Sequence, residues 1–257
     1  MKCGYEVDQK GVAILKINNP PMNAIDEELM EQMETALQSI AGDDAVKVVI
    51  ISGEGMAFIA GADIKKMQEI DTASETEAMA RRGQDLLNMI ENSRKPVIAA
   101  INGLALGGGT ELALACHMRI AAQSAQMGLP EIRLGILPGF GGTQRSARLL
   151  GPARALELML TGKFIGMAEA DKIGLVNMVV PDEELMDEAK KFASKIATKG
   201  QLAVRSIVEV VIEGVKKPLA EGLKMERELL GKLAETEDKR EGVAAFIEKR
   251  KPVFTDK

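Results

Sequence analysis

The sequence predicts an α/β protein whose core spans residues 1–198 and whose remaining residues, 199–257, are helical. Short aliphatic runs alternate with amphipathic segments up to about residue 198, a pattern typical of strands and helices that share one core. From residue 201 to residue 249, helical periodicity continues without a strand pattern. The chain has 257 residues, 46% of them hydrophobic, which is enough for one large domain with a smaller helical region.

Buried strands are predicted where aliphatic residues run together between turn-forming residues. The expected strands are Val12–Ile17, Val46–Ser52, Pro96–Ile101, Met118–Ala122, Ala125–Gly128 and Gly174–Val180. Phe58–Lys66 contains a glycine and lacks a regular pattern, so we expect an irregular segment that leads into a helix.

Helices are predicted where apolar residues recur at helical spacing. Asp26 is a suitable N-cap for the first helix, whose apolar face consists of Leu29, Met33, Leu37 and Ile40. Further helices are expected at Glu75–Ser93, Glu111–Cys116, Thr143–Gly151, Arg154–Thr161 and Asp182–Ala197. Gly200 stands just beyond the last of these and is expected at its C′ position. Breaks at Gly214 and Pro218 divide the helices that follow.

The composition argues against nucleic-acid binding and against a metal site. Aromatic residues make up 3% of the chain and Trp is absent, so a stacking platform for bases is not expected. The net charge of −5 gives no general attraction to phosphates. The single histidine, His117, rules out a multi-histidine zinc site within one chain. Because His117 lies in an apolar segment, we interpret it as a structural residue at a helix end or core edge.

The sequence is also typical of a cytoplasmic protein. Cys3 and Cys116 have neither metal-ligand spacing nor a disulfide framework, which favours a reducing compartment. The first residues lack the apolar segment of a secretory signal. The longest uncharged run, Val97–Thr110, is shorter than the roughly 20 apolar residues of a membrane helix. We therefore expect no membrane span.

The stretch Leu104–Gly142 contains the candidate catalytic residues. Glu111 and Glu131 both lie in segments with few other charges, where a carboxylate is costly unless it has a partner or a task. Two such carboxyls close together would titrate as a pair and suit acid–base chemistry. The alternatives remain open at this point: Glu111 would also complement a helix dipole, and Glu131 would also suit the surface.

The glycine triplet Gly107–Gly109 before Glu111 has two interpretations as well. It permits a ligand to approach backbone N–H groups at a helix N-terminus, and it equally permits tight helix packing. Neither nucleotide fingerprint, G-x-G-x-x-G or G-x-x-x-x-G-K-[ST], occurs in the chain. A second glycine-rich segment, Pro138–Gly142, adds modest support for a binding site.

Several segments together resemble the crotonase family, and in particular its enoyl-CoA hydratases. They are NPPMNA at Asn19–Ala24, FIAGADIKKM at Phe58–Met67, ALGGGTELALAC at Ala105–Cys116, GLPEIRLGILPGFGGTQR at Gly128–Arg145 and EGVAAFIEKRKPVF at Glu241–Phe254. The resemblance runs nearly from end to end. It implies a spiral of strand–strand–helix (ββα) units over residues 1–198. It also implies a C-terminal helical oligomerisation region over residues 199–257, which packs trimers that usually assemble into hexamers.

The resemblance also implies roles for particular residues. The backbone N–H groups of Ala62 and Gly108 would form the oxyanion hole for a thioester carbonyl. Glu111 and Glu131 would hold a water, with Glu111 as its base and Glu131 as the proton donor to Cα. The coenzyme A (CoA) part of the substrate would contact Ala62, Asp63, Ile64, Lys65 and Gly108, and its adenine end would contact Phe246 and Lys249, often those of a neighbouring subunit.

The implied activity is that of a lyase, an enoyl-CoA hydratase that adds water reversibly across the 2,3 double bond of a trans-2-enoyl-CoA. The product is a 3-hydroxyacyl-CoA, as in fatty-acid β-oxidation or related acyl-CoA degradation. The expected partners are an acyl-CoA thioester and further copies of the chain, a hexamer built as a dimer of trimers. No metal or separate cofactor is expected, because coenzyme A is part of the substrate.

Three other activities are compatible with the resemblance. A cyclic dienoyl-CoA hydratase would keep both glutamates, whereas an enoyl-CoA isomerase typically has one of them replaced. An RNA-binding homologue would need a Lys-rich helix, but here the segment from Lys65 to Met79 interleaves acids with its lysines. The family commonly shows Ala-Cys-Asp where this chain has Ala115-Cys116-His117. His117 lies about 240° round a helix from Glu111, so we expect it outside the site.

Overall fold

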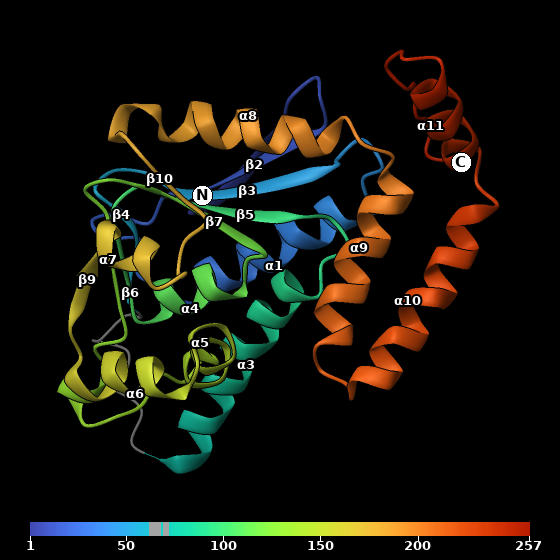
Figure 1. Cartoon of the computed structure of the whole chain (residues 1–257). Coiled ribbons are helices and arrows are strands. Elements are labelled where there is room, and N and C mark those ends of the chain that lie inside the picture. Colours follow the sequence, from blue (N-terminus) through green and yellow to red (C-terminus); the bar gives the residue numbers. More distant parts are fainter. Residues whose placement is uncertain (62–67, 69–71) are drawn as a thin grey trace.

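The computed structural model describes residues 1–61, 68 and 72–257, and places their strands in two sheets (Figure 1). The larger sheet has six strands in the order β1-β2-β3-β5-β7-β10, all parallel to their neighbours except β1, which pairs antiparallel with β2. These strands are β1 (Cys3–Val7), β2 (Val12–Ile17), β3 (Val48–Gly53), β5 (Val97–Ile101), β7 (Met118–Ala122) and β10 (Met178–Val180).

The smaller sheet has four strands in the order β4-β6-β8-β9, and only β9 is antiparallel to its neighbour. They are β4 (Ala57–Ala60), β6 (Leu104–Leu106), β8 (Gln126–Gly128) and β9 (Phe164–Gly166). Three consecutive units repeat one pattern: a strand of the large sheet (β3, β5 or β7) is followed directly by a strand of the small sheet and then by helical structure. This arrangement confirms the predicted α/β spiral of ββα units.

Helices cover both faces of the large sheet (Figure 1). Helix α8 (Leu185–Ala197) packs on one face, against β2, β3, β5 and β7, while α1 (Glu27–Gly42) and α3 (Ala73–Glu91) lie on the other side. All five residues of β5 are buried as a result, which explains its uninterrupted aliphatic sequence. The predicted N-cap of α1 is confirmed, because the Leu29 N–H donates to Asp26 Oδ1 at 2.8 Å.

The other helices of the core surround α4 (Gly108–Ala115), all eight residues of which are buried. Pro130 precedes a short 3-10 helix, η1 (Glu131–Leu134). Helix α5 (Gly142–Leu150) packs against both α4 and α6 (Pro152–Thr161), and α7 (Met167–Lys172) follows β9. A second 3-10 turn, η2 (Asp182–Glu184), leads into α8.

Several expectations from the sequence differ from the structure. The prediction omits β1, β6, β9 and α7, and β4 occupies residues expected to be irregular. The four strands in this group have three to five residues each, which is too few for an aliphatic run to stand out. Gly174–Val180 forms a strand only from Met178, because Gly174 adopts a φ of +76° and turns the chain after α7. Gly200 is not a C′ residue: with a φ of −59° it precedes the next helix as its N-cap.

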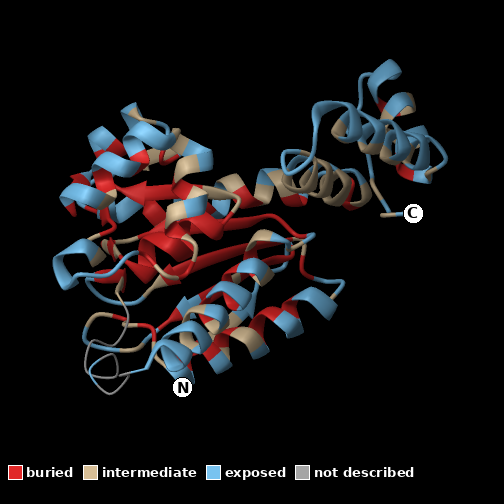
Figure 2. Ribbon diagram, turned by 90° about the horizontal axis from the view of Figure 1, so that it is seen from below, coloured by how far each residue is buried: buried red, intermediate tan, exposed pale blue. Residues whose placement is uncertain are grey.

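Three helices, α9 (Gln201–Gly214), α10 (Leu219–Ala234) and α11 (Glu237–Ile247), complete the chain and extend away from the sheets (Figure 1). Helices α9 and α10 pack together, and α9 is tied to the core by an ion pair between Arg94 and Glu209. Buried residues concentrate in the sheets and in the helices beside them, whereas α10 and α11 are largely exposed (Figure 2). The helical character of residues after 200 is thus confirmed, and the division at residue 198 into two regions stays a prediction.

Within the described ranges, no helix combines the length and hydropathy needed to cross a bilayer.

Candidate active site

The N-terminus of α4 is the centre of the candidate site, and its glycines are required there for two reasons. Gly107 has a φ of +54°, and a side chain on it would approach Glu131 Oε1 to within 2.9 Å. A Cβ on Gly109 would lie 2.0 Å from the carbonyl oxygen of Ile59 in β4. The interpretation of tight packing is therefore confirmed, since the triplet packs the helix closely against β4, and ligand approach to its N-terminus stays a prediction. The N–H of Gly108, the first residue of α4, has no intrahelical partner.

Glu111 lies in the first turn of α4 and is 2% exposed. Its Oε1 atom accepts hydrogen bonds from the N–H groups of Phe140 at 2.8 Å and Gly142 at 2.7 Å. Gly142 is the first residue of α5, so the carboxyl group lies at the N-termini of two helices, where a negative charge is favoured. Burial disfavours the charged form and is the larger influence on the pKa, and the like charge of Glu131 acts in the same direction as burial. Together they raise the pKa of Glu111 to about 7.

Glu131 opens η1 and presents its carboxyl group to the N-terminus of α4, beside Gly107. Its Oε2 atom is buried and has no hydrogen-bond partner among the described residues. Burial raises the pKa of Glu131 as well. An unpaired buried carboxyl oxygen is costly, and this atom is free to bond a group that the described residues do not supply.

The two carboxyl groups therefore differ in their surroundings although both have raised pKa values. Two backbone N–H groups stabilise the ionised form of Glu111, whereas Oε2 of Glu131 receives no such donor. A pair of this kind can hold one proton between its members at neutral pH. One carboxylate is then available as a base while the other carries a proton, which is the requirement for adding or removing water at a carbon–carbon double bond.

The loop Pro138–Gly142, which supplies both donors to Glu111, is held by side chains that the sequence did not single out. Gln84 and Arg145 donate to its carbonyl oxygens, and Arg145 in turn contacts Asn88 and Glu91 of α3. The sequence signal was available in the polar residues that directly follow the second glycine-rich segment. Their partners in α3 lie more than fifty positions away and could not be inferred.

His117 has the structural role predicted from its apolar context. Its Nδ1 atom accepts a hydrogen bond of 2.9 Å from the Val97 N–H, so the proton resides on Nε2, which is 3.0 Å from the Glu91 carbonyl oxygen. Burial lowers the pKa of His117 and favours this neutral form. The imidazole thereby joins the C-terminus of α3 to the start of β5 and makes no contact with Glu111 or Glu131.

The remaining predicted site residues fall into two groups. Ala62, Asp63, Ile64 and Lys65 lie outside the described residues. Phe246 belongs to α11 and is 85% exposed, and Lys249 follows that helix with a φ of +53°. Helix α11 lies on the far side of the molecule from α5 and α6 in Figure 1. Phe246 and Lys249 therefore lie away from the glutamate pair within one chain.

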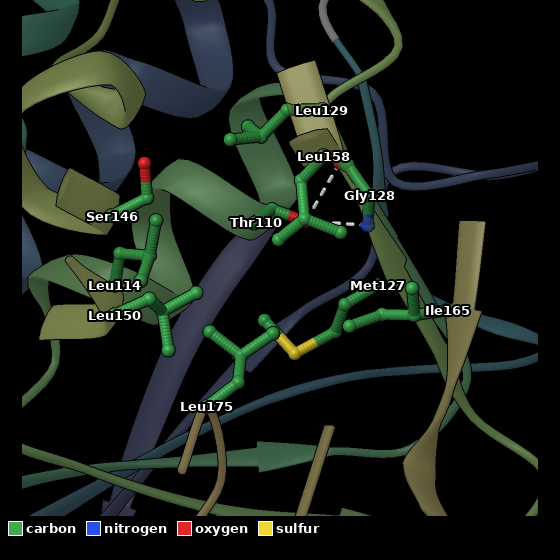
Figure 3. Close-up of a pocket in the computed structure, with 10 residues that line it drawn as sticks. All are labelled: Thr110, Leu114, Met127, Gly128, Leu129, Ser146, Leu150, Leu158, Ile165 and Leu175. Carbon is green, nitrogen blue, oxygen red and sulfur yellow. Dashed lines mark hydrogen bonds between the residues drawn. The ribbon is translucent and has the colours of Figure 1, made fainter. Parts of the chain in front are cut away.

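A small apolar cavity of about 10 Å³ lies beside α4, and neither Glu111 nor Glu131 is among its lining residues (Figure 3). Its walls include Leu114 of α4, Leu150 of α5 and Leu158 of α6. The Thr110 hydroxyl at its edge has two carbonyl acceptors, that of Ala105 at 2.5 Å and that of Gly128 at 2.9 Å, and it accepts from the Gly128 N–H at 3.1 Å. Because the hydrogen-bonding capacity of the Thr110 hydroxyl is used in this way, this group is not available to a substrate. We interpret the cavity as a packing void of the core.

Comparison with known proteins identifies the family. The model of the family described as enoyl-CoA hydratase/isomerase matches residues 7–257. The chain is 46% identical over 244 residues to a probable enoyl-CoA hydratase of Bacillus subtilis (strain 168), covering 95% of both proteins. It is 45% identical over 251 residues to a crotonyl-CoA hydratase of Syntrophomonas wolfei, covering 97% of this chain and 96% of the relative. A crystal structure of enoyl-CoA hydratase from Bacillus anthracis matches over the full length of both chains, with a TM-score of 0.96 and 40% identity. This protein therefore belongs to the enoyl-CoA hydratase/isomerase family, the crotonase family that its motifs resemble.

Proposed function

We propose that this protein is an enoyl-CoA hydratase, a lyase that adds water reversibly to a trans-2-enoyl-CoA and forms a 3-hydroxyacyl-CoA. The observation that carries the proposal is that the buried carboxyl group of Glu111 and the carboxyl group of Glu131, whose Oε2 atom is buried, both lie at the glycine-rich N-terminus of α4, close enough for the charge of one to raise the pKa of the other. Relatives that are 42–46% identical and are named enoyl-CoA hydratase or crotonyl-CoA hydratase support it.

In this mechanism Glu111 is the base and Glu131 the acid. The two N–H donors on Oε1 of Glu111 favour its ionised form, and its other oxygen takes a proton from the water that attacks Cβ. Glu131 delivers a proton to Cα from its Oε2 atom, the atom that lacks a partner in the described structure. Each of these proton transfers contributes a factor of about 10²–10⁴ to the rate.

Negative charge develops on the thioester oxygen as water adds to Cβ, and the proposed stabilising group is the Gly108 N–H at the start of α4. It acts from a helix N-terminus, where the dipole favours an anion. The second proposed donor, the Ala62 N–H, is in the segment outside the described residues. It directly follows Gly61, whose Cα lies close to the Gly107 position. Losing one such donor typically costs a factor of about 10²–10³ in rate.

The CoA portion is proposed to lie along Ala62, Asp63, Ile64 and Lys65, with Phe246 and Lys249 of a neighbouring subunit at its adenine end. A homo-oligomer, in the form of a hexamer made of two trimers, would supply that neighbour. Exposed apolar side chains on the C-terminal helices support assembly, because such residues gather where subunits meet. They are Ile207, Val211, Val215, Leu219, Leu223 and Leu230. In this proposal coenzyme A enters as part of the substrate and no separate cofactor takes part.

The expected setting is acyl-CoA degradation, as in fatty-acid β-oxidation, in the cytoplasm. Two buried free thiols, Cys3 and Cys116, are consistent with a reducing compartment. Burial raises the pKa of each thiol to about 12, so neither forms a reactive thiolate at neutral pH.

The test is the change in absorbance of the conjugated thioester across a panel of 2-enoyl, 3-enoyl and cyclic dienoyl CoA esters. A hydratase removes the absorbance of a 2-enoyl-CoA, whereas an isomerase creates it from a 3-enoyl-CoA. If only the cyclic dienoyl ester is turned over, the proposed substrate changes from a linear enoyl-CoA to a cyclic dienoyl-CoA. Failure to hydrate any ester, with folded oligomeric protein, would contradict the proposal.

A further inference from the structure

We propose that Arg145 is a positioning residue of this site, which holds the loop Pro138–Gly142 so that its N–H groups stay directed at Glu111. The inference rests on the proposed role of Glu111 as the base. Arg145 does not touch the carboxyl group of Glu111 itself. It acts on Phe140, whose N–H donates to Glu111.

The backbone of Phe140 is bonded on both sides. Its N–H donates to Glu111 Oε1 at 2.8 Å, and its carbonyl oxygen accepts from Nη1 of Arg145 at 2.9 Å. The next residue, Gly141, has a φ of +108°, and a Cβ there would lie 2.3 Å from Nη1 of Arg145. The guanidinium group therefore occupies the space that a side chain at position 141 would need. Loop conformation and arginine position depend on each other.

Helix α3 holds the other edge of the guanidinium group. Nε and Nη2 of Arg145 donate to Glu91 Oε2 at 3.0 and 2.8 Å, and Nη2 also donates to Asn88 Oδ1 at 2.7 Å. Gln84, one turn earlier on the same helix face, donates to the Gly139 carbonyl oxygen at 2.8 Å. The spacing of these three α3 residues, four and then three positions, places them in one row along the loop.

Only arginine can make these contacts together. Its planar group directs several N–H donors at fixed angles, so one side chain reaches the Phe140 carbonyl, Asn88 and Glu91 at once. The side chain is 11% exposed and its partner Glu91 is 28% exposed, so water competes weakly with the contacts. Lysine would retain the charge but would lose the fixed arrangement of donors.

The positive charge of Arg145 also favours the ionised form of Glu111. Among the described residues, the charged groups that act on Glu111 are Glu131, which raises its pKa, and Arg145, which lowers it. Glu91 partly offsets Arg145 through their ion pair. Removing Arg145 takes away a favourable charge and loosens two N–H donors, and both changes raise the pKa of Glu111.

The test compares Arg145→Lys, Arg145→Gln and Glu91→Gln with the control Arg148→Gln. Arg148 lies on the same helix and is exposed, and its recorded hydrogen bonds are to Gln144 within α5. The first measurement is an infrared pH titration of the carboxyl band that disappears in Glu111→Gln, which requires no turnover. The second is the pH profile of kcat, with KM, for the substrate that the wild type turns over best.

In Arg145→Gln we expect the Glu111 midpoint to rise by about one pH unit, with the acid limb of kcat moving equally. At neutral pH the ionised fraction would fall from about a half to about a tenth, a loss of about fivefold in kcat, with little change in KM. Arg145→Lys keeps the charge and should show a smaller part of the shift, and Arg148→Gln should match the wild type. Glu91→Gln loosens the arginine but also removes the charge that offsets it, so its Glu111 midpoint should move less than that of Arg145→Gln.

An unchanged Glu111 midpoint in folded Arg145→Gln and Arg145→Lys proteins would overturn the positioning role. If Arg145→Gln does not fold, the midpoint in Arg145→Lys decides the question in the same way. A shifted midpoint in a protein whose wild type hydrates no ester would keep the positioning role and reject the proposed function.

Discussion

The Gly142 N–H donates a 2.7 Å hydrogen bond to Oε1 of Glu111, and this contact joins the first turn of α5 to the first turn of α4. Residues 31 positions apart thus place one carboxyl group at two helix N-termini. Burial raises the pKa of that carboxyl to about 7, and the Gly142 and Phe140 N–H donors, which lower the pKa, keep it within the range where a base works at neutral pH. Four predictions follow from this site and from the elements that support it.

Glu111→Gln and Glu131→Gln should each lower kcat for hydration by a factor of about 10² or more, because each removes a group that transfers a proton. CoA binding should survive, since the amide keeps the size of the side chain and one oxygen for the Phe140 and Gly142 N–H groups. Steady-state kinetics and equilibrium binding of a CoA thioester measure the two effects separately. Near-full activity in either variant would reject the acid–base assignment.

The stability of the protein should depend on pH through Glu111. Its carboxyl binds a proton up to about pH 7 when folded but only up to about 4.5 in the unfolded chain. Because the pKa is raised in the folded state, the contribution of Glu111 to the free energy of unfolding is fully present below its unfolded-state pKa. This contribution is lost as the pH rises from about 4.5 to about 7. Glu111→Gln should remove this loss, so its unfolding free energy relative to wild type should increase by about 3 kcal/mol between pH 4.5 and pH 8. Denaturant unfolding at the two pH values measures it, and a difference independent of pH would contradict the prediction.

Gly109→Ala should destabilise the protein and displace the candidate oxyanion donor. The added Cβ would meet the Ile59 carbonyl oxygen at 2.0 Å, so α4 must move away from β4 and carry Gly108 with it. We expect a loss of about 1–3 kcal/mol in unfolding free energy together with reduced kcat. Gly42→Ala is the matched control, because a Cβ there meets no atom within 4 Å and the residue ends α1. Equal stability of the two variants would show that α4 tolerates the displacement.

His117→Phe should reduce stability without changing the pH profile of kcat. The phenyl ring cannot accept from the Val97 N–H or donate to the Glu91 carbonyl, and leaving such buried groups unpaired costs about 1–3 kcal/mol each. Thermal unfolding and the kcat profile at a temperature well below the transition measure the two properties. A shifted kcat profile would give His117 a place in the proton transfers, contrary to its structural interpretation.

The sequence predicts the long elements of this fold better than the short ones. Val12–Ile17 and Met118–Ala122 form strands with the predicted bounds, because their aliphatic side chains face covered surfaces of the large sheet. The small sheet consists of three- and four-residue strands, and their hydrogen bonds come from neighbours far along the chain. Leu104–Leu106, for example, pairs with both β4 and β8, a relationship that no local pattern contains. Gly200 is the N-cap of α9 and not, as predicted, the C′ residue of the preceding helix. A glycine between two helices suits both positions, so the sequence does not distinguish them.

What the sequence by itself determined was the identity of the chemical groups. Glu111 and Glu131 stand out as carboxylates in segments with few other charges, and their roles are implied by the resemblance to the crotonase family. The apolar segment around His117 indicates a structural residue. Only the tertiary structure decided how these groups are supported. It alone brings Phe140, Gly142 and Arg145 to Glu111 and places Glu91 behind Arg145, since hydrogen bonds between distant segments depend on where the fold carries each segment. The residues that perform the proposed chemistry are local features of the sequence, and the charge they carry is set by contacts across the fold.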